Sequence, residues 1–288
     1  MTLFAELILN GIVSGLVIGL AALAVTLVFG IARFANASTG DVMTLGAYAA
    51  LSGAGATGSL LLGGLLGAGV GALTGLVAYM LVFRKLAGRP SVAALLASIG
   101  VAFIIRAAMG VAFGHQQKVF QMPLVRPWRV FDIRIHPNDL TLSAVALGAL
   151  AIVFFILHAT PMGRRMRAVA DDASLARVSG ISPQGVMIAL WMLAGAVSGV
   201  AGTLIGIKTV VSPEMGWDLL LPAFAAAIFG GIGHPLGAVV AGVILGIVQE
   251  VATPFVGFTY KIALSFVVLL AVLLVRPKGL FGTAEGAR

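Results

Sequence analysis

The stretch 160-TPMGRRMRAVADDASLARVSGISPQ-184 is the polar segment around which the rest of the chain is arranged. Thr160-Pro161 and Ser182-Pro183 each resemble a helix N-cap followed by proline at the first helical position. Asp171 or Asp172 is suited to cap a second short helix, and Gly180-Ile181 is typical of a C-terminal cap with its hydrophobic contact. Capped turns of this kind predict a folded structure at a membrane surface rather than a flexible linker.

The composition indicates a membrane protein. Of 288 residues, 60% are hydrophobic and only 10% are charged, whereas a soluble domain carries roughly 25% charged residues. Five apolar runs are mostly long enough to cross a bilayer; they are 7–31, 60–83, 140–157, 186–207 and 262–275. Backbone amides in lipid must be bonded internally, and these runs exceed the short strands of an outer-membrane barrel. The expected fold class is therefore an all-α polytopic membrane protein.

The net charge of +8 does not indicate nucleic-acid binding, because the basic residues lie in short connections between apolar runs. Membrane topology accounts for them more simply. The absence of cysteine excludes disulfides, thiol catalysis and thiolate metal sites. The first apolar run lacks a basic leader and is too long for a signal peptide, so we expect it to remain as the first helix.

Further apolar pieces raise the expected number of crossings to nine. These pieces are 42–54, 92–113, 217–233 (broken by Pro222) and 236–251. The shorter pieces are alternatively re-entrant, which gives a range of eight to ten transmembrane helices. Between the crossings, residues 130–135 alternate as a β-strand would.

The distribution of basic residues predicts the orientation of the chain. With nine crossings, residue 33 and segments 84–89, 164–177 and 276–288 lie on one side and hold eleven of the eighteen lysines and arginines. The positive-inside rule places this side in the cytoplasm, the N-terminus in the periplasm and the C-terminus in the cytoplasm. The outer segment 115–139 is also basic, so the asymmetry is modest.

The sequence also contains an internal repeat at a constant offset of 176 residues. Gly19, Gly30, Ile31, Gly40, Leu45, Ala47, Ala49, Ala50, Gly55 and Leu60 recur as Gly195, Gly206, Ile207, Gly216, Leu221, Ala223, Ala225, Ala226, Gly231 and Leu236. Because the two copies begin on opposite sides, the pattern predicts an inverted repeat, as in transporters whose pathway runs between two halves. The halves span about 1–158 and 184–276 of a single transmembrane domain. The alternative is a bias of a glycine- and alanine-rich composition.

The polar stretch 160–184 is a candidate contact for an energy-coupling partner. No phosphate-binding loop exists, since none of the five lysines follows a glycine, so any ATPase must be a separate subunit. Three small residues at helical spacing form a face that a partner can approach closely. They are Ala173, Ala176 and Gly180, and the polar residues that can ring them are Arg167, Asp171, Asp172 and Arg177. The alternative is an ordinary arginine-rich loop that only sets topology.

Several segments resemble one family of membrane proteins in the family's order. The run MRAVADDASLARVSGIS, from 166 to 182, resembles the coupling loop of the permease subunits of ABC importers for branched-chain amino acids. Residues 36–48, the run LASIG at 96–100 with Gly114, and 222–238 are similar to further conserved segments of that family. The resemblance thus covers nearly the whole chain.

The resemblance implies a permease subunit of the inner membrane, without ATPase activity of its own. Its implied partners are a second permease subunit (homologous or a second copy), two ATPase subunits that use ATP, a periplasmic solute-binding protein and membrane lipid, with no nucleic acid. The implied substrate is a branched-chain amino acid or a similar small polar solute such as an amide or urea. Two departures from the family pattern, at 37–39 and Arg106, leave the exact substrate and the partner permease open.

Polar and aromatic residues within the apolar runs, or in the break 36–41 between the first two, are candidates for a translocation path. These candidates are Asn36, Thr39, Tyr48, Phe224, Arg106 and Glu250. Charges in lipid are costly and should face protein, water or each other, so Arg106 and Glu250 are either path residues or a structural pair. The four histidines share no metal-ligand spacing, and no metal, catalytic or cofactor site is expected in this chain.

Two other classes of transport protein compete with the importer. An ion-coupled secondary transporter of small solutes could use the same repeat, but it generally needs a membrane-embedded ion site. Glu250 is the only isolated acidic candidate for such a site. A channel would need no coupling loop.

Overall fold

A computed structural model describes residues 2–122, 126–130, 133–276 and 279–281. The helices are α1 (Thr2–Ala32), α2 (Ser38–Thr57), α3 (Leu60–Leu81), η1 (Phe83–Leu86), α4 (Ser91–Phe113), α5 (Pro137–Ala159), α6 (Pro161–Asp171), α7 (Ala173–Val178), α8 (Pro183–Lys208), α9 (Met215–Gly230), α10 (Pro235–Val256), η2 (Phe258–Tyr260) and α11 (Lys261–Val275). Two short strands, β1 (Trp128–Val130) and β2 (Ile133–Ile135), pair antiparallel.

The long helices confirm the prediction of an all-α polytopic membrane protein. Within the described residues, seven helices are long and apolar enough to cross a membrane, and α9 is a shorter apolar helix. Together with α2, they correspond one to one with the nine apolar pieces of the sequence. The central helix is α1, because most of its apolar window is buried, whereas α11 packs at the periphery. Exposed apolar side chains on α3, α4, α5 and α11 form the surface suited to lipid.

Two local predictions need correction. Pro222 does not break the apolar piece 217–233, because α9 continues through it; other groups can satisfy the backbone freed by proline in a membrane protein. The alternating segment 130–135 is not one strand: β1 and β2 form a hairpin in which Trp128 pairs with Ile135. Residues 131–132, between the two strands in sequence, lie outside the described residues.

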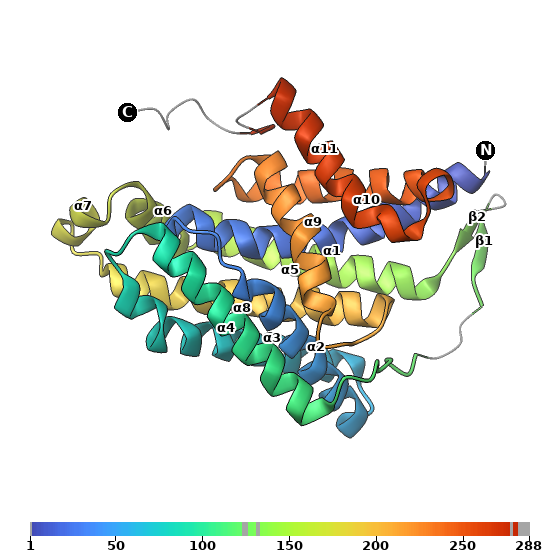
Figure 1. The fold of residues 1–288 in the computed structure, drawn as a ribbon, viewed down its shortest axis with the longest axis horizontal. Helices are drawn as coiled ribbons and strands as arrows, with labels where there is room; N and C mark the ends of the chain where they lie inside the picture. The colour runs from blue at the N-terminus through green and yellow to red at the C-terminus, as the bar shows by residue number, and fades with distance from the viewer. Residues whose placement is uncertain (1, 123–125, 131–132, 277–278, 282–288) are drawn as a thin grey trace.

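Two antiparallel helix pairs hold the molecule together through glycines. Along α3 and α8, a Cβ added at Gly71 would lie 2.3 Å from the carbonyl oxygen of Gly195. Along α1 and α10, a Cβ added at Gly246 would lie 2.3 Å from the Cα of Gly15. These backbones touch. Close packing inside one chain therefore explains why buried glycines recur every four residues along α3, at Gly63, Gly67, Gly71 and Gly75. In Figure 1, α1 and α10 run side by side, while α6 and α7 project at the opposite end from β1 and β2.

Candidate functional site: the coupling loop and the intramembrane charges

The caps predicted in the segment 160–184 are present. The Thr160 hydroxyl accepts a hydrogen bond from the backbone N–H of Gly163, and the carboxylate of Asp172, not Asp171, accepts from the N–H groups of Ser174 and Leu175. Gly180 has φ +80°, and the N–H of the residue after it donates to the Ala176 carbonyl at 2.9 Å. A left-handed glycine followed by a hydrogen bond that spans six residues is the C-terminal cap predicted for α7. The segment is therefore two capped helices, α6 and α7, rather than an unstructured linker.

The cap of α7 yields a testable expectation. The pKa of Asp172 lies below its usual value because the Ser174 hydroxyl and the N–H groups of Leu175 and Ser174 stabilise the carboxylate. Because this pKa is lower in the folded state, the carboxylate stabilises the folded loop fully at pH values above its pKa in the unfolded chain, about 4. The stabilisation is lost as the pH falls through the pKa of the folded state. We expect Asp172→Ala to speed hydrogen exchange of the Ser174 and Leu175 amides at neutral pH. Asp172→Asn, which keeps an acceptor, is the matched control and should stay near wild type; equal exchange in all three proteins would contradict the cap.

Two arginines attach the loop to the membrane domain. Arg33 follows α1 with a left-handed backbone (φ 59°) and donates from its guanidinium to the Ala170 carbonyl at 2.6 Å. Arg167 donates to the Leu157 carbonyl near the end of α5. The guanidinium of Arg167, expected to face a partner, thus bonds within the chain. Two hydrogen bonds thus connect α6 of the loop to the membrane helices.

The predicted small-residue face is only partly available to a partner. Ala176 is buried, with 4% of its surface exposed, because its small side chain lets α7 lie against the body of the protein. The apolar side chains that point outward are instead Leu175 and Val178, at 65% and 86% exposure. The other predicted contact residues are exposed; they are Asp171, Asp172, Ala173, Arg177 and Gly180. Figure 1 shows α7 as the outermost element at this end of the molecule.

Most of the predicted path residues lie inside the subunit. Asn36, Thr39 and Tyr48 are buried, and Phe224 is partly buried against the core. The Asn36 side chain accepts from the backbone N–H and hydroxyl of Ser38, at the start of α2. Tyr48 stacks on Phe113 with ring centroids 4.5 Å apart. Within this one subunit, these side chains pack against their neighbours and do not line an open path.

The two intramembrane charges each have a partner that sequence reasoning missed. Arg106 binds both carboxylate oxygens of Asp41, at 3.0 and 3.2 Å, and Asp41 is fully buried. Glu250 pairs with Lys261 at 2.8 Å. The hypothesis of an Arg106–Glu250 pair is therefore wrong. The missed signal was Asp41 itself, which lies in α2 rather than in a break between helices.

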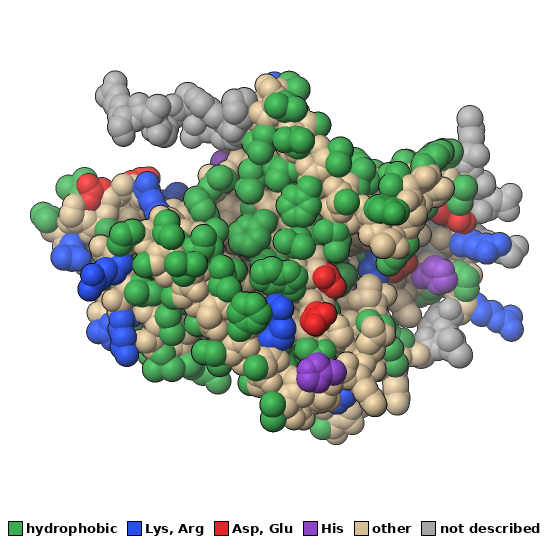
Figure 2. Space-filling view, viewed as in Figure 1, with side chains coloured by type: hydrophobic (Ala, Val, Ile, Leu, Met, Phe, Trp, Pro, Cys, Tyr) green, Lys and Arg blue, Asp and Glu red, His purple; other side chains and the backbone are tan. Residues whose placement is uncertain are grey.

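Charged side chains gather on one otherwise hydrophobic face. The Arg106 guanidinium lies over the rings of Phe103 and Trp217, at 5.6 and 5.1 Å. Glu214 and Asp218 are exposed beside it at the start of α9. We call Asp41, Arg106, Glu214 and Asp218 the intramembrane charge cluster. Figure 2 shows basic and acidic side chains together in the middle of this face.

Nothing in the described part of the chain resembles a metal centre, since it contains no group of three or more histidine, aspartate or glutamate side chains placed to hold an ion. The fold and the two sites define a class: a polytopic membrane protein with a structured surface loop. A family model described as the permease component of branched-chain amino acid transport systems matches residues 7–275. The chain belongs to this family of transport proteins, and it is a multi-pass membrane protein.

Individual relatives agree with the family. The chain is 32% identical to the high-affinity branched-chain amino acid transport system permease protein LivH of Escherichia coli K12, over 98% of this chain and 96% of that protein. It is 26% identical to the corresponding permease protein BraD of Pseudomonas aeruginosa, over 98% and 97%. The solved structure of PsaBC from Streptococcus pneumoniae in complex with Fab is similar at a TM-score of 0.51 and 14% identity, over 93% and 91% of the two chains. That likeness supports the fold.

Proposed function

We propose that this chain is one of two membrane-spanning subunits of an ATP-driven importer that carries branched-chain amino acids or similar small polar solutes across the inner membrane. Two ATPase subunits bind it from the cytoplasm, and a periplasmic solute-binding protein delivers the substrate. The N-terminus lies in the periplasm and the C-terminus in the cytoplasm. The observation that carries the proposal is the capped loop with Leu175 and Val178 exposed at its tip.

The coupling step follows from how that loop is held. A partner groove that encloses Leu175 and Val178 removes apolar surface from water and gains stability. Because Arg33 and Arg167 bind carbonyls at the ends of α6 and α5, a movement of the loop is transmitted to the membrane helices. Closure of the ATPases on ATP then shifts the membrane domain between outward-open and inward-open states.

The inverted repeat remains part of this proposal. Under the offset of 176 residues, α1 corresponds to α8 and α3 to α10. The glycine-lined pair of α1 with α10 therefore corresponds to the pair of α8 with α3. Gly40 and Gly216 are repeat mates, and a Cβ on either would strike the carbonyl oxygen of the other. A contact between equivalent residues is expected where a pseudo-twofold axis passes between two halves.

The translocation path is proposed to run along the face that carries the intramembrane charge cluster. Charged groups within a membrane span face protein or water rather than lipid. The exposed side chain of Asp218, in the first turn of α9, therefore favours a second permease subunit opposite this face, with a polar path between the two. The buried candidates Asn36, Thr39 and Tyr48 would support this face, and Phe224 would pack behind it. Glu250 is assigned to the outer end of the subunit, away from the path.

Crosslinking tests the docking site directly, because the chain has no cysteine of its own. We expect Leu175→Cys and Val178→Cys each to form a crosslink with a cysteine in the ATPase groove of the assembled complex. Ala176→Cys is the matched control one residue away: buried against the body of the protein, it should react weakly. Crosslinking through Ala176 alone, in an active complex, would contradict this orientation of α7.

Reconstitution in vesicles separates the classes of transporter. The importer takes up leucine only with the ATPase subunits and ATP, while a secondary transporter needs only a proton or sodium gradient. Gradient-driven uptake by the chain alone would overturn the proposed function. Competition by other amino acids, amides and urea then identifies the substrate class.

A further inference from the structure

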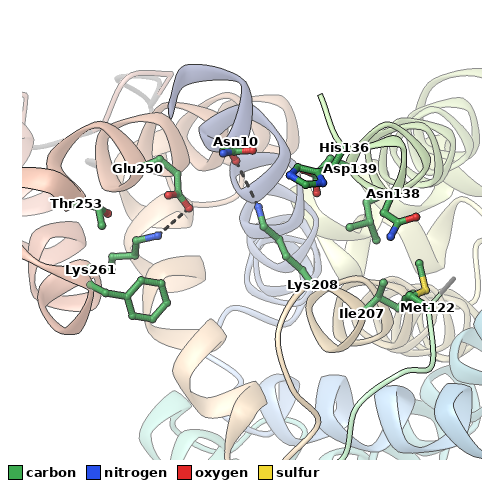
Figure 3. A pocket seen from close by; sticks show the side chains of 12 residues that line it. Asn10, Met122, His136, Asn138, Asp139, Ile207, Lys208, Glu250, Thr253 and Lys261 are labelled. Carbon is green, nitrogen blue, oxygen red and sulfur yellow. Dashed lines mark hydrogen bonds and ion pairs between the residues drawn. The ribbon is translucent and has the colours of Figure 1, made fainter. Parts of the chain in front are cut away.

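A polar cavity of about 490 Å³ opens at the end of the molecule opposite the coupling loop. Side chains from α1, α5, α8, α10 and α11 line it, and neither the coupling loop nor the intramembrane charge cluster contributes to it. Figure 3 shows Lys208 in the centre, Glu250 and Lys261 on one side, and Asp139 with His136 and Asn138 on the other. Charged groups of both signs thus face one cavity.

Two of these charges already neutralise each other. Glu250 pairs with Lys261 at 2.8 Å and accepts a hydrogen bond from the Ser14 hydroxyl at 3.0 Å. Lys208 donates to that same hydroxyl and to the backbone carbonyl of Asn10. The network therefore satisfies Glu250 and Lys261, but it offers Lys208 only neutral acceptors.

The other two charges, on Lys208 and Asp139, form no salt bridge among the described residues. No carboxylate in that part of the chain lies within the 4.0 Å of a salt bridge from Lys208, and no described side chain donates to the carboxylate of Asp139. Both residues are only partly buried. A cation and an anion that face one cavity without binding each other are complementary to a ligand that carries an anionic and an ammonium group.

We propose that this cavity binds the headgroup of an aminophospholipid, with the phosphate on Lys208 and the ammonium group on Asp139. The surroundings favour a lipid. Phe258 lines the cavity and is 73% exposed, and Tyr260 beside it is 59% exposed. Tyrosine and tryptophan side chains concentrate at the level of lipid headgroups, as Tyr260 would here. From that level α11 extends with exposed apolar side chains such as Leu270, which gives acyl chains a surface to follow.

A free amino acid carries the same pair of charges, so the test must separate the two sources. Native mass spectrometry of the purified complex would be used to titrate phosphatidylethanolamine, phosphatidylcholine and phosphatidylglycerol with identical acyl chains, and free leucine. We expect phosphatidylethanolamine to bind at least tenfold more tightly than the other two lipids. The quaternary ammonium of phosphatidylcholine has no proton to donate to Asp139, and phosphatidylglycerol has no ammonium group.

Substitutions of the two charged residues test whether the lipid binds in this cavity. Lys208→Met and Asp139→Asn should each weaken phosphatidylethanolamine binding about tenfold, as expected for one charge-assisted hydrogen bond. Lys118→Met removes a positive charge outside the cavity and should leave binding unchanged. Equal binding of the three lipids, or unchanged binding in both cavity variants, would overturn the proposal. Saturable binding of leucine in place of lipid would also overturn it, and the selectivity of the wild-type complex decides the matter even if a variant fails to assemble.

Discussion

Asp41→Ala is expected to destabilise the subunit by about 3 kcal/mol or more, because breaking a buried ion pair costs about 3–5 kcal/mol. The carboxylate of Asp41 is fully buried and accepts two hydrogen bonds from Arg106. Its removal leaves a guanidinium within a membrane-spanning helix without its counter-ion. We expect a lower midpoint of thermal unfolding and a smaller yield of folded subunit in detergent.

The double variant separates the charge from the packing. In Asp41→Ala/Arg106→Met neither charge of the pair remains, and we expect most of the lost stability to return, since replacement of a buried pair by apolar groups is often nearly neutral. Glu214→Gln, which alters an exposed acid of the same cluster, is the control and should unfold like wild type. If Asp41→Ala were as stable as wild type, the ion pair would contribute nothing to the fold. Transport by the stable double variant then reports whether Arg106 acts in the path.

The membrane helices were predictable because lipid imposes one rule on every span. A long apolar run must form a helix that bonds its own backbone, so nine apolar pieces became nine helices. Proline was misjudged because its effect depends on neighbours: α9 continues through Pro222. The hairpin was misjudged for a related reason. Alternation along 130–135 describes the direction of side chains and contains no information about where the chain turns.

In the candidate site too, features set by neighbouring residues could be predicted from the sequence, whereas contacts between distant segments could not. Caps at Thr160, Asp172 and Gly180 were predictable, because each is satisfied within a few residues of chain. The outward side of α7 was not, since a small residue such as Ala176 suits a partner's groove and a packed core equally well. The partner of Arg106 was beyond sequence reasoning because it lies 65 residues away on another helix.

The close contact of α3 with α8 predicts a large effect from a small change. We expect Gly71→Val to prevent normal packing, because a Cβ at this position would lie 2.3 Å from the Gly195 carbonyl oxygen and 3.1 Å from the backbone of Gly199. Rigid backbone on the far side leaves no flexible side chain to move away. Overpacking typically costs about 1–3 kcal/mol, and the loss here should lie at or above the upper end of that range. The midpoint of thermal unfolding and the yield of folded subunit in detergent measure this loss.

Gly69→Val is the matched control on the same helix. It makes the same change in helix propensity and in volume, but no heavy atom lies within 4 Å of its added Cβ. Because the two variants differ only in what the new side chain meets, their difference isolates the contact between α3 and α8. Equal stability of both would mean that the helices are not in contact at Gly71. A loss confined to Gly71→Val would establish that these glycines pack two helices of one subunit.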